Sequence, residues 1–241
     1  MMNNHLKNLL NNDPQQTIAT RGFFANYPVN EFHIHRNSAI IFGESDHMWA
    51  HLISSSKLEL QHLLKDFHSK TNYYYSVEEW MIPLILKYGK PDWIMKTNRY
   101  ILKDAIKIPV PKEEIFSLNK SRSDFIFTHS NYKKFTSINY IRDRLQRDIS
   151  AGILKDDKLV AWGFTHDDGA LGFLHVLPDF RKQGLGKQVL LSLIRQRRAN
   201  NQPVFCNIVP ENFPSINSVL FQHQVFHLGD QYLTSTPLID C

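Results

Sequence analysis

The sequence predicts an α/β fold of the α+β kind, in which helices cover a mixed sheet, and two observations carry this prediction. In the second half of the chain, three strands joined by tight hairpins precede a long amphipathic helix and a further strand. A strand, a crossover helix and another strand imply a parallel pair, so the sheet is mixed. The second observation is the Gly-rich, basic stretch VLPDFRKQGLGKQVLLSLIRQRR from Val176 to Arg198, which is typical of a strand, a turn and a helix N-terminus.

The first half of the chain predicts strands followed by helices. The alternating EFHIHR, the apolar run AIIFG and the segment HMWAHLI are typical of strands between residues 23 and 53. Ser56 with Glu59 forms a capping-box pattern that predicts a helix, and Ser76 with Glu79 predicts a second helix start. The stretch NRYILKD predicts one more strand.

A boundary between two units is predicted in IKIPVPKEEIFSLNKSRS, which has two prolines and mixed charge. It separates residues 1–112 from residues 113–241. A length of 241 residues suits one large domain or two small ones, each with its own core.

In the second half, Asp124–Thr128 predicts a first strand, and Ser137 opens an amphipathic helix. Hairpins at Asp156 and Asp168 join the strands GILKD, KLVAWGFT and ALGFLHV. The segment VFCNIV, which contains Cys206, predicts the strand after the long helix, so we expect Cys206 to be buried. Since Pro178 cannot donate to a ladder, we expect strand pairing to end there.

The bulk composition indicates a soluble globular protein with an anionic partner. The net charge is +5 and the pI is near 9.1, which suits either nucleic acid or the phosphates of a nucleotide cofactor. The basic residues cluster at Arg181–Lys187 and Arg195–Arg198, and this favours a local cofactor site. No recognition-helix pattern or aromatic-rich basic strand accompanies them, so we expect no nucleic-acid partner.

Membrane, secretory and metal functions are not indicated by the sequence. It contains no apolar run of membrane-spanning length and no signal-peptide pattern, which predicts a cytoplasmic protein without a membrane partner. Two histidine pairs could suggest a metal site: His33 and His35 share one strand face, and His47 and His51 would be adjacent on a helix. Neither pair has a further ligand at a matching spacing, so no metal site is predicted. The two cysteines are too few and too far apart for a metal framework.

The stretch from Arg181 to Gly186, RKQGLG, resembles the Gln/Arg-x-x-Gly-x-Gly/Ala signature of the GNAT superfamily of N-acetyltransferases. With the preceding GALGFLHVLPDF and LVAWGFTHDDG, it is most similar to the glycine N-acyltransferase-like branch. The resemblance is good over residues 124–236. Over residues 20–105 it covers only the order of elements, and it implies a degenerate N-terminal copy of the same fold.

The resemblance implies acetyl-CoA, or another acyl-CoA, as co-substrate. Amides of the Gly-rich turn would hold the pyrophosphate, in keeping with the unpaired N–H groups at a helix start. Pantetheine would lie between two strands that splay apart. The implied cofactor-binding residues are Leu174, His175, Val176, Arg181, Lys182, Gln183, Gly184, Leu185, Gly186, Lys187, Asn212 and Phe221.

The catalytic groups depart from the pattern of the family. Phe221 stands where many relatives place a tyrosine that protonates the departing thiolate, and it is two residues further from Asn212 than usual. Ala170 and Gly172 occupy positions where many relatives carry a glutamate or histidine base.

Nearby titratable residues offer substitutes for that base. His175 is the first candidate, and His166 and Asp167 are weaker ones. Strand alternation would put His175 on the opposite face from Ala170 and Gly172 unless a bulge intervenes.

Three functions remain open from the sequence. The first is transfer of an acyl group from acyl-CoA to a primary amine, small molecule or peptide, by direct attack. The second is an acyl-CoA-binding module without catalysis, and the third and weakest is nucleic-acid binding. The resemblance implies that the helix of Tyr140 and Arg144 borders the acceptor site. For either residue taken alone, a solvated charged helix face is the better explanation. The oligomeric state is left open between monomer and homodimer.

Overall fold

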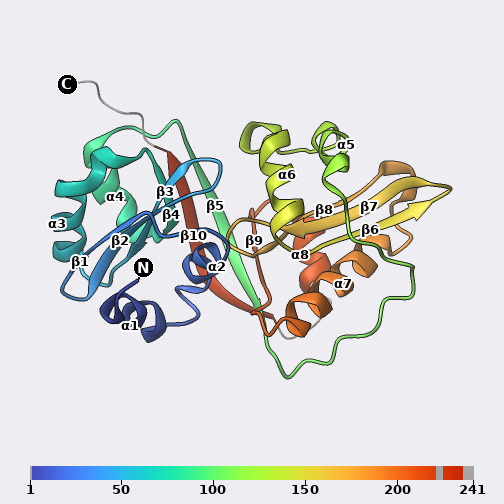
Figure 1. Cartoon of the computed structure of the whole chain (residues 1–241), viewed down its shortest axis with the longest axis horizontal. Coiled ribbons are helices and arrows are strands. Elements are labelled where there is room, and N and C mark those ends of the chain that lie inside the picture. The colour runs from blue at the N-terminus through green and yellow to red at the C-terminus, as the bar shows by residue number, and fades with distance from the viewer. Residues whose placement is uncertain (1, 221–224, 236–241) are drawn as a thin grey trace. The chain divides into compact units, whose positions relative to one another are not determined.

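The computed structural model describes residues 2–220 and 225–235, and for residues 218–220 and 225–235 it describes the backbone only. The chain forms two compact units (Figure 1). Unit 1 is the described part of Met1–Asn98 and Leu228–Cys241, and unit 2 is Arg99–His227. That residues 1–112 and 113–241 are separate domains stays a prediction.

Unit 1 is a mixed sheet with helices on both faces. Its strands follow the order β1-β2-β3-β4-β10-β5, in which β3 and β4 are parallel and the pairs β1–β2, β2–β3 and β4–β10 are antiparallel. The elements are α1 (Asn4–Asn12), α2 (Ile18–Asn26), β1 (Glu31–His35), β2 (Ser38–Glu44), β3 (Met48–Ile53), α3 (Lys57–Phe67), β4 (Tyr73–Val77), α4 (Ile82–Ile85), the first part of β5 (Trp93–Leu102) and most of β10 (Val225–Ser235).

Strand alternation explains the two cores of unit 1. Ile40 and Phe42 of β2 face α3 and α4, and they share a core with Leu60 and Leu63. Residues 39 and 41 face the opposite way and pack against α1. The strands predicted between residues 23 and 53 are therefore confirmed. The helix start at Ser56 is confirmed too, because its hydroxyl oxygen accepts from the N–H of Glu59 at 3.4 Å.

The helix start predicted at Ser76 is wrong. Ser76 lies inside β4 with a left-handed φ of 55°, and its hydroxyl makes no hydrogen bond within the described residues. The turn of helix begins only at Glu79. The run YYYSV has high β-propensity and is mostly buried between β3 and β10, so strand packing overrides the capping pattern.

Unit 2 contains the Gly-rich turn and a three-stranded antiparallel sheet of order β6-β7-β8. Helix α7 covers one face, since a side chain on Gly163 would meet Val189 and Leu193, and α5 covers the other, where Phe125 packs edge-on to Trp162. The elements are α5 (Ser123–Thr128), α6 (Ile138–Arg147), β6 (Ser150–Lys155), β7 (Lys158–Thr165), β8 (Leu171–Val176), α7 (Leu185–Ala199), β9 (Phe205–Ile208) and α8 (Phe213–Leu220).

Most of the predicted elements of unit 2 are confirmed, including the hairpins and the helix after Ser137. The strand predicted at Asp124–Thr128 is wrong, because these residues belong to α5. A short apolar run fits either structure, and here a helix buries Ile126 in the core while Asp124 and Thr128 stay exposed.

The two strands that flank α7 belong to different sheets. β8 is the edge of the three-stranded sheet, whereas β9 neighbours β5, and the N–H of Leu102 donates to the carbonyl of Val204 at 2.9 Å. The parallel pair predicted from the order of strand, crossover helix and strand is therefore wrong for β8 and β9, and the two strands splay apart as the resemblance implied. Cys206 of β9 is buried as predicted, and burial raises the pKa of its thiol to about 12.

Residues 103–118, here called the strap, run along α7 toward its N-terminus. The guanidinium of Arg198 donates to the carbonyl oxygens of Lys103, at 2.8 Å, and Ile106. Further along, Arg195 donates to the carbonyl of residue 108 at 3.2 Å, and the side-chain oxygen of Gln188 accepts from the N–H of residue 112 at 2.7 Å. Arg195 and Arg198 were predicted as part of an anion-binding cluster, but both donate to backbone carbonyl oxygens of the strap.

Candidate functional site

The Gly-rich turn ends at Gly184, which caps the 15-residue helix α7 with a left-handed φ of 79°. A residue with a Cβ is strained in this conformation, although the space around Gly184 is open: apart from its two chain neighbours, no residue would lie within 4 Å of the added carbon. The first helical hydrogen bond runs from the N–H of Gln188 to the carbonyl of Gly184 at 3.2 Å. The N–H groups of Leu185 and Gly186 lie in the first turn, before this bond, and such groups point out of the start of a helix.

The turn is held against the end of β8. The Nε of Arg181 donates to the carbonyl of Val176 at 3.1 Å, and a Cβ on Gly186 would lie 3.3 Å from Val176. The ladder stops here as predicted, with a last bond from the N–H of Leu177 and a short helical turn that begins at Pro178. Residues 181, 182 and 187 therefore present three exposed cationic side chains at a helix N-terminus.

A β-bulge interrupts β8 just before the turn. The pairing register shifts between Trp162 and Phe164, and Phe173 takes a left-handed φ of 50°. Because of this shift, His175 pairs with Trp162 and Gly172 pairs with Phe164, so His175 and Gly172 share one face of the sheet. Simple alternation would place His175 and Gly172 on opposite faces, and it fails here because a bulge does intervene.

His175 packs among aromatic rings on this face. Its ring stacks on Trp162 with centroids 4.6 Å apart, and His129 lies edge-on at 6.4 Å. Burial, together with smaller effects of the charges of Arg181 and His129, lowers the pKa of His175 to about 4. The imidazole is thus neutral at neutral pH and only weakly basic.

Gly172, where relatives carry a base, leaves room for another histidine. A Cβ there would lie 2.1 Å from Nε2 of His166, so the His166 ring occupies that position. Burial lowers the pKa of His166, and the nearby Asp168 opposes this effect. Ala170 is buried in the hairpin, where its N–H donates to Oδ1 of Asp168 at 2.8 Å.

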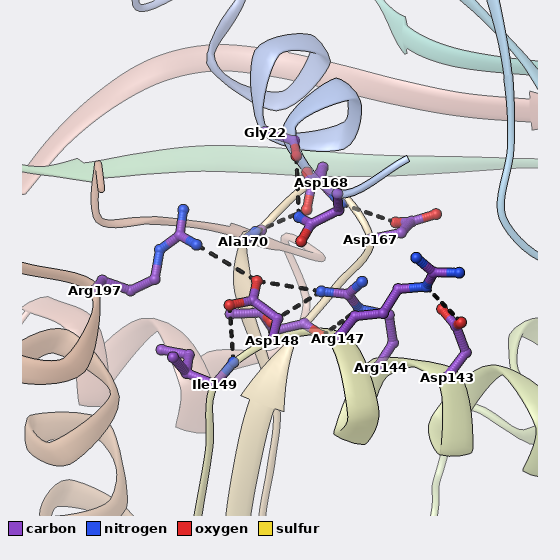
Figure 2. A network of polar contacts seen from close by, with 12 residues as sticks. Gly22, Asp143, Arg144, Arg147, Asp148, Ile149, Asp167, Asp168, Ala170 and Arg197 are labelled. Atoms are coloured by element: carbon purple, nitrogen blue, oxygen red, sulfur yellow. Dashed lines mark hydrogen bonds and ion pairs between the residues drawn. The ribbon is translucent and has the colours of Figure 1, made fainter. Parts of the chain in front are cut away.

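Arg144 belongs to a buried polar network (Figure 2). Its Nε donates to the carbonyl of Thr165 at 3.2 Å and its Nη2 to Asp148 at 3.2 Å, and Arg197 reaches the same carboxylate at 3.5 Å. Arg144 is therefore neither on a solvated face nor open to an acceptor. The oxygen of Tyr140 accepts from the N–H of Asp167 at 3.2 Å.

Asn212 caps the helix that follows β9. Its Oδ1 accepts from the N–H of Ser215 at 3.3 Å, and its Nδ2 donates to the hydroxyl of Tyr132 at 3.2 Å. Phe221, which the resemblance places at the acid position, lies outside the described residues.

Two features that other kinds of site require are absent from the described residues. Among the described side chains, those of residues 2–217, no three or more His, Cys, Asp and Glu residues gather as a metal ion would require. Within the described residues 2–220 and 225–235, no helix combines the length and the apolar character needed to cross a membrane.

Comparison with known proteins identifies the architecture. The model of the FR47-like protein family matches residues 150–230. A Drosophila protein of known structure is 19% identical with a TM-score of 0.75, over 97% of this chain and 90% of that one. A GCN5-related N-acetyltransferase from Kribbella flavida is 10% identical with a TM-score of 0.58, over 92% and 94% of the two chains. A GNAT-family acetyltransferase from Colwellia psychrerythraea is 12% identical with a TM-score of 0.51, over 93% and 97%. The chain has the GNAT fold. No curated protein matches its sequence.

Within this GNAT fold, the predicted cofactor residues fall into two groups. Residues 174–176 form the end of β8, and residues 181–187 form the turn and the start of α7, joined to β8 by the Arg181 bond. Asn212 follows β9, the other strand of the splayed pair. The sequence raised the bulge only as a condition and named His166 only as a weaker base candidate. Whether the strand is bulged depends on the pairing of β7 with β8, and the position of the His166 ring at Gly172 is seen only in the fold.

Proposed function

We propose that this GNAT-fold protein transfers an acyl group from acyl-CoA to a primary amine. The observation that carries the proposal is the turn of residues 181–187, with its outward N–H groups and three cationic side chains at the start of α7. Such a helix start binds phosphate through its N–H groups and its positive end. The pyrophosphate of CoA would lie there, and the pantetheine arm would continue between β8 and β9.

Direct attack needs few groups from the protein. The amine nitrogen bonds to the thioester carbonyl carbon, the C–S bond breaks and its electron pair leaves on sulfur. A thiol such as that of CoA has a pKa of about 8.5, so the thiolate is a tolerable leaving group even without an acid at residue 221. The bulge at Phe173 takes backbone groups of β8 out of the ladder, and an N–H there would polarise the thioester carbonyl.

The proton on the attacking amine has two candidate acceptors in the chain. His175 and His166 lie near the bulge, and burial lowers the pKa of both. A base works best when its pKa is near the working pH, so each would be weak at neutral pH. We therefore propose that the amine arrives neutral or loses its proton through water.

A second function is favoured by the same depressed pKa values and by Ala170 and Gly172. Without a strong base, the protein would bind acyl-CoA as a sensor or interaction module. The glycine N-acyltransferase-like branch, the acceptor, the monomeric or dimeric state and the cytoplasmic location all stay predictions.

One experiment separates these functions. Calorimetry first measures CoA binding, and release of free thiol from acetyl-CoA is then followed with and without a panel of small amines and peptides. Amine-dependent thiol release supports the enzyme. Tight binding without release at any amine supports the sensor, and absence of CoA binding would remove both.

A further inference from the structure

A side-chain bridge connects the two strands that splay apart. Asp168 lies in the hairpin before β8, and Asn207 lies on β9. The Nδ2 of Asn207 donates to Oδ2 of Asp168 at 3.1 Å. The two strands belong to different sheets, so no backbone ladder fixes their spacing.

Each group in the bridge has its orientation set by another contact. The Nε of Arg99 donates to Oδ1 of Asn207 at 3.0 Å, and this turns the amide NH₂ toward Asp168. On the other side, Oδ1 of Asp168 accepts from the N–H of Ala170 at 2.8 Å. Asp168 is wholly buried and Arg99 is 1% exposed, so water cannot replace these partners.

We propose that Asp168 and Asn207 are positioning residues that set the separation of β8 and β9. The inference rests on the proposed function, in which pantetheine lies between these strands. The bridge joins the start of β8 to β9, whereas the phosphate-binding turn follows the end of β8. Altering the bridge should therefore disturb the pantetheine arm and leave the nucleotide end of CoA in place.

The donor and acceptor pattern provides an internal control. Asp168→Asn offers one oxygen where two N–H groups need acceptors, and Asn207→Asp sets two carboxylates against each other. The double variant Asp168→Asn with Asn207→Asp reverses the direction of the bond. Residue 168 still accepts from Ala170, and residue 207 still accepts from Arg99. The double variant also keeps the charge of the wild type.

The test compares two ligands by calorimetry: CoA, and adenosine bisphosphate carrying the 3′ and 5′ phosphates, which lacks pantetheine. Each single variant should bind CoA about tenfold more weakly, because an unsatisfied buried group no longer holds the separation that the pantetheine arm requires. Affinity for the bisphosphate should stay within about twofold, and the double variant should regain most of the CoA affinity.

Asp148→Asn is the matched control. It makes the same chemical change in the same unit and weakens the contacts with Arg144 and Arg197, but it does not bridge the splayed strands. Its affinities for the two ligands should keep the wild-type ratio. If a bridge variant fails to fold, Asn207→Ser, which shortens the side chain without adding charge, decides in its place.

The positioning role would be overturned if the single bridge variants lost affinity for CoA and for the bisphosphate equally. It would also be overturned if the double variant did not regain affinity for CoA. A wild-type protein that binds the bisphosphate as tightly as CoA would overturn it as well, because the pantetheine arm would then add nothing to the affinity. A wild type that binds neither ligand refutes the proposed function itself, and the two failures are therefore distinguishable.

Discussion

Exchanging Gly184 for Asp and for Asn is the sharpest test of the phosphate site. Both residues have nearly the same size, and both tolerate the left-handed φ of 79° better than other side chains do. Since no residue other than the two chain neighbours lies within 4 Å of a Cβ at this position, neither should disturb the packing. The two variants should therefore differ only in the negative charge.

The size of the difference follows from Coulomb's law. A carboxylate about 5 Å from a phosphate is repelled by about 0.8 kcal/mol in bulk water and about 3 kcal/mol at an effective dielectric constant near 20. CoA should thus bind to Gly184→Asp roughly 4- to 150-fold more weakly than to Gly184→Asn.

Calorimetry at low and at high salt measures this difference. It should shrink as salt is added, because residue 184 is exposed and its charge is screened. Equal CoA affinity of the two variants at low salt would show that the pyrophosphate does not lie at the turn.

Three further predictions use charge and protonation. Arg181→Ala should weaken CoA binding more at low salt than at high salt, which titration at two ionic strengths checks; equal weakening at both would contradict it. For the proposed transfer, kcat/KM should rise with pH toward the pKa of the acceptor amine. His175→Ala should keep this pH profile, because the pKa of His175 is about 4. If kcat/KM instead rises near pH 6.5 and the variant loses that rise, His175 is the base. In unit 1, burial lowers the pKa of His51 to about 3 from 6.5, so the unfolded chain takes up its proton first as the pH falls. Stability should fall from pH 6.5 toward pH 3, by about 2 kcal/mol from this residue at pH 5. Denaturant titration should show a smaller loss in His51→Phe, and an unchanged loss would rule His51 out as the cause.

Local signals in the sequence were enough to predict much of unit 2. The hairpins at Asp156 and Asp168, the turn at Gly184 and the helix after Ser137 each depend on a few neighbouring residues, and the structure contains them all. The splay of β8 and β9 followed from the resemblance that the turn indicated. Unit 1 was predicted correctly wherever apolar residues alternate.

The features that the sequence did not predict depend on distant partners. Asp124–Thr128 fits a strand or a helix equally well, and only its packing decides. Arg144 belongs to a polar stretch, yet it is wholly buried because Asp148 and the carbonyl of Thr165 satisfy its guanidinium. The bulge at Phe173 is a mismatch between two strands and has no signature within one of them.

The strap determines where the chain can be cut. It has the prolines and mixed charge of an ordinary linker, and between Leu102 and Lys120, a fully described stretch, it forms no helix or continuous strand. A protease needs backbone that it can draw into its active site, and here side chains of α7 hold that backbone at several points. The strap should therefore resist nicking in the native protein. An expression fragment that starts at residue 113 would strip Arg195 and Arg198 of their carbonyl partners, whereas one that starts at Arg99 keeps them.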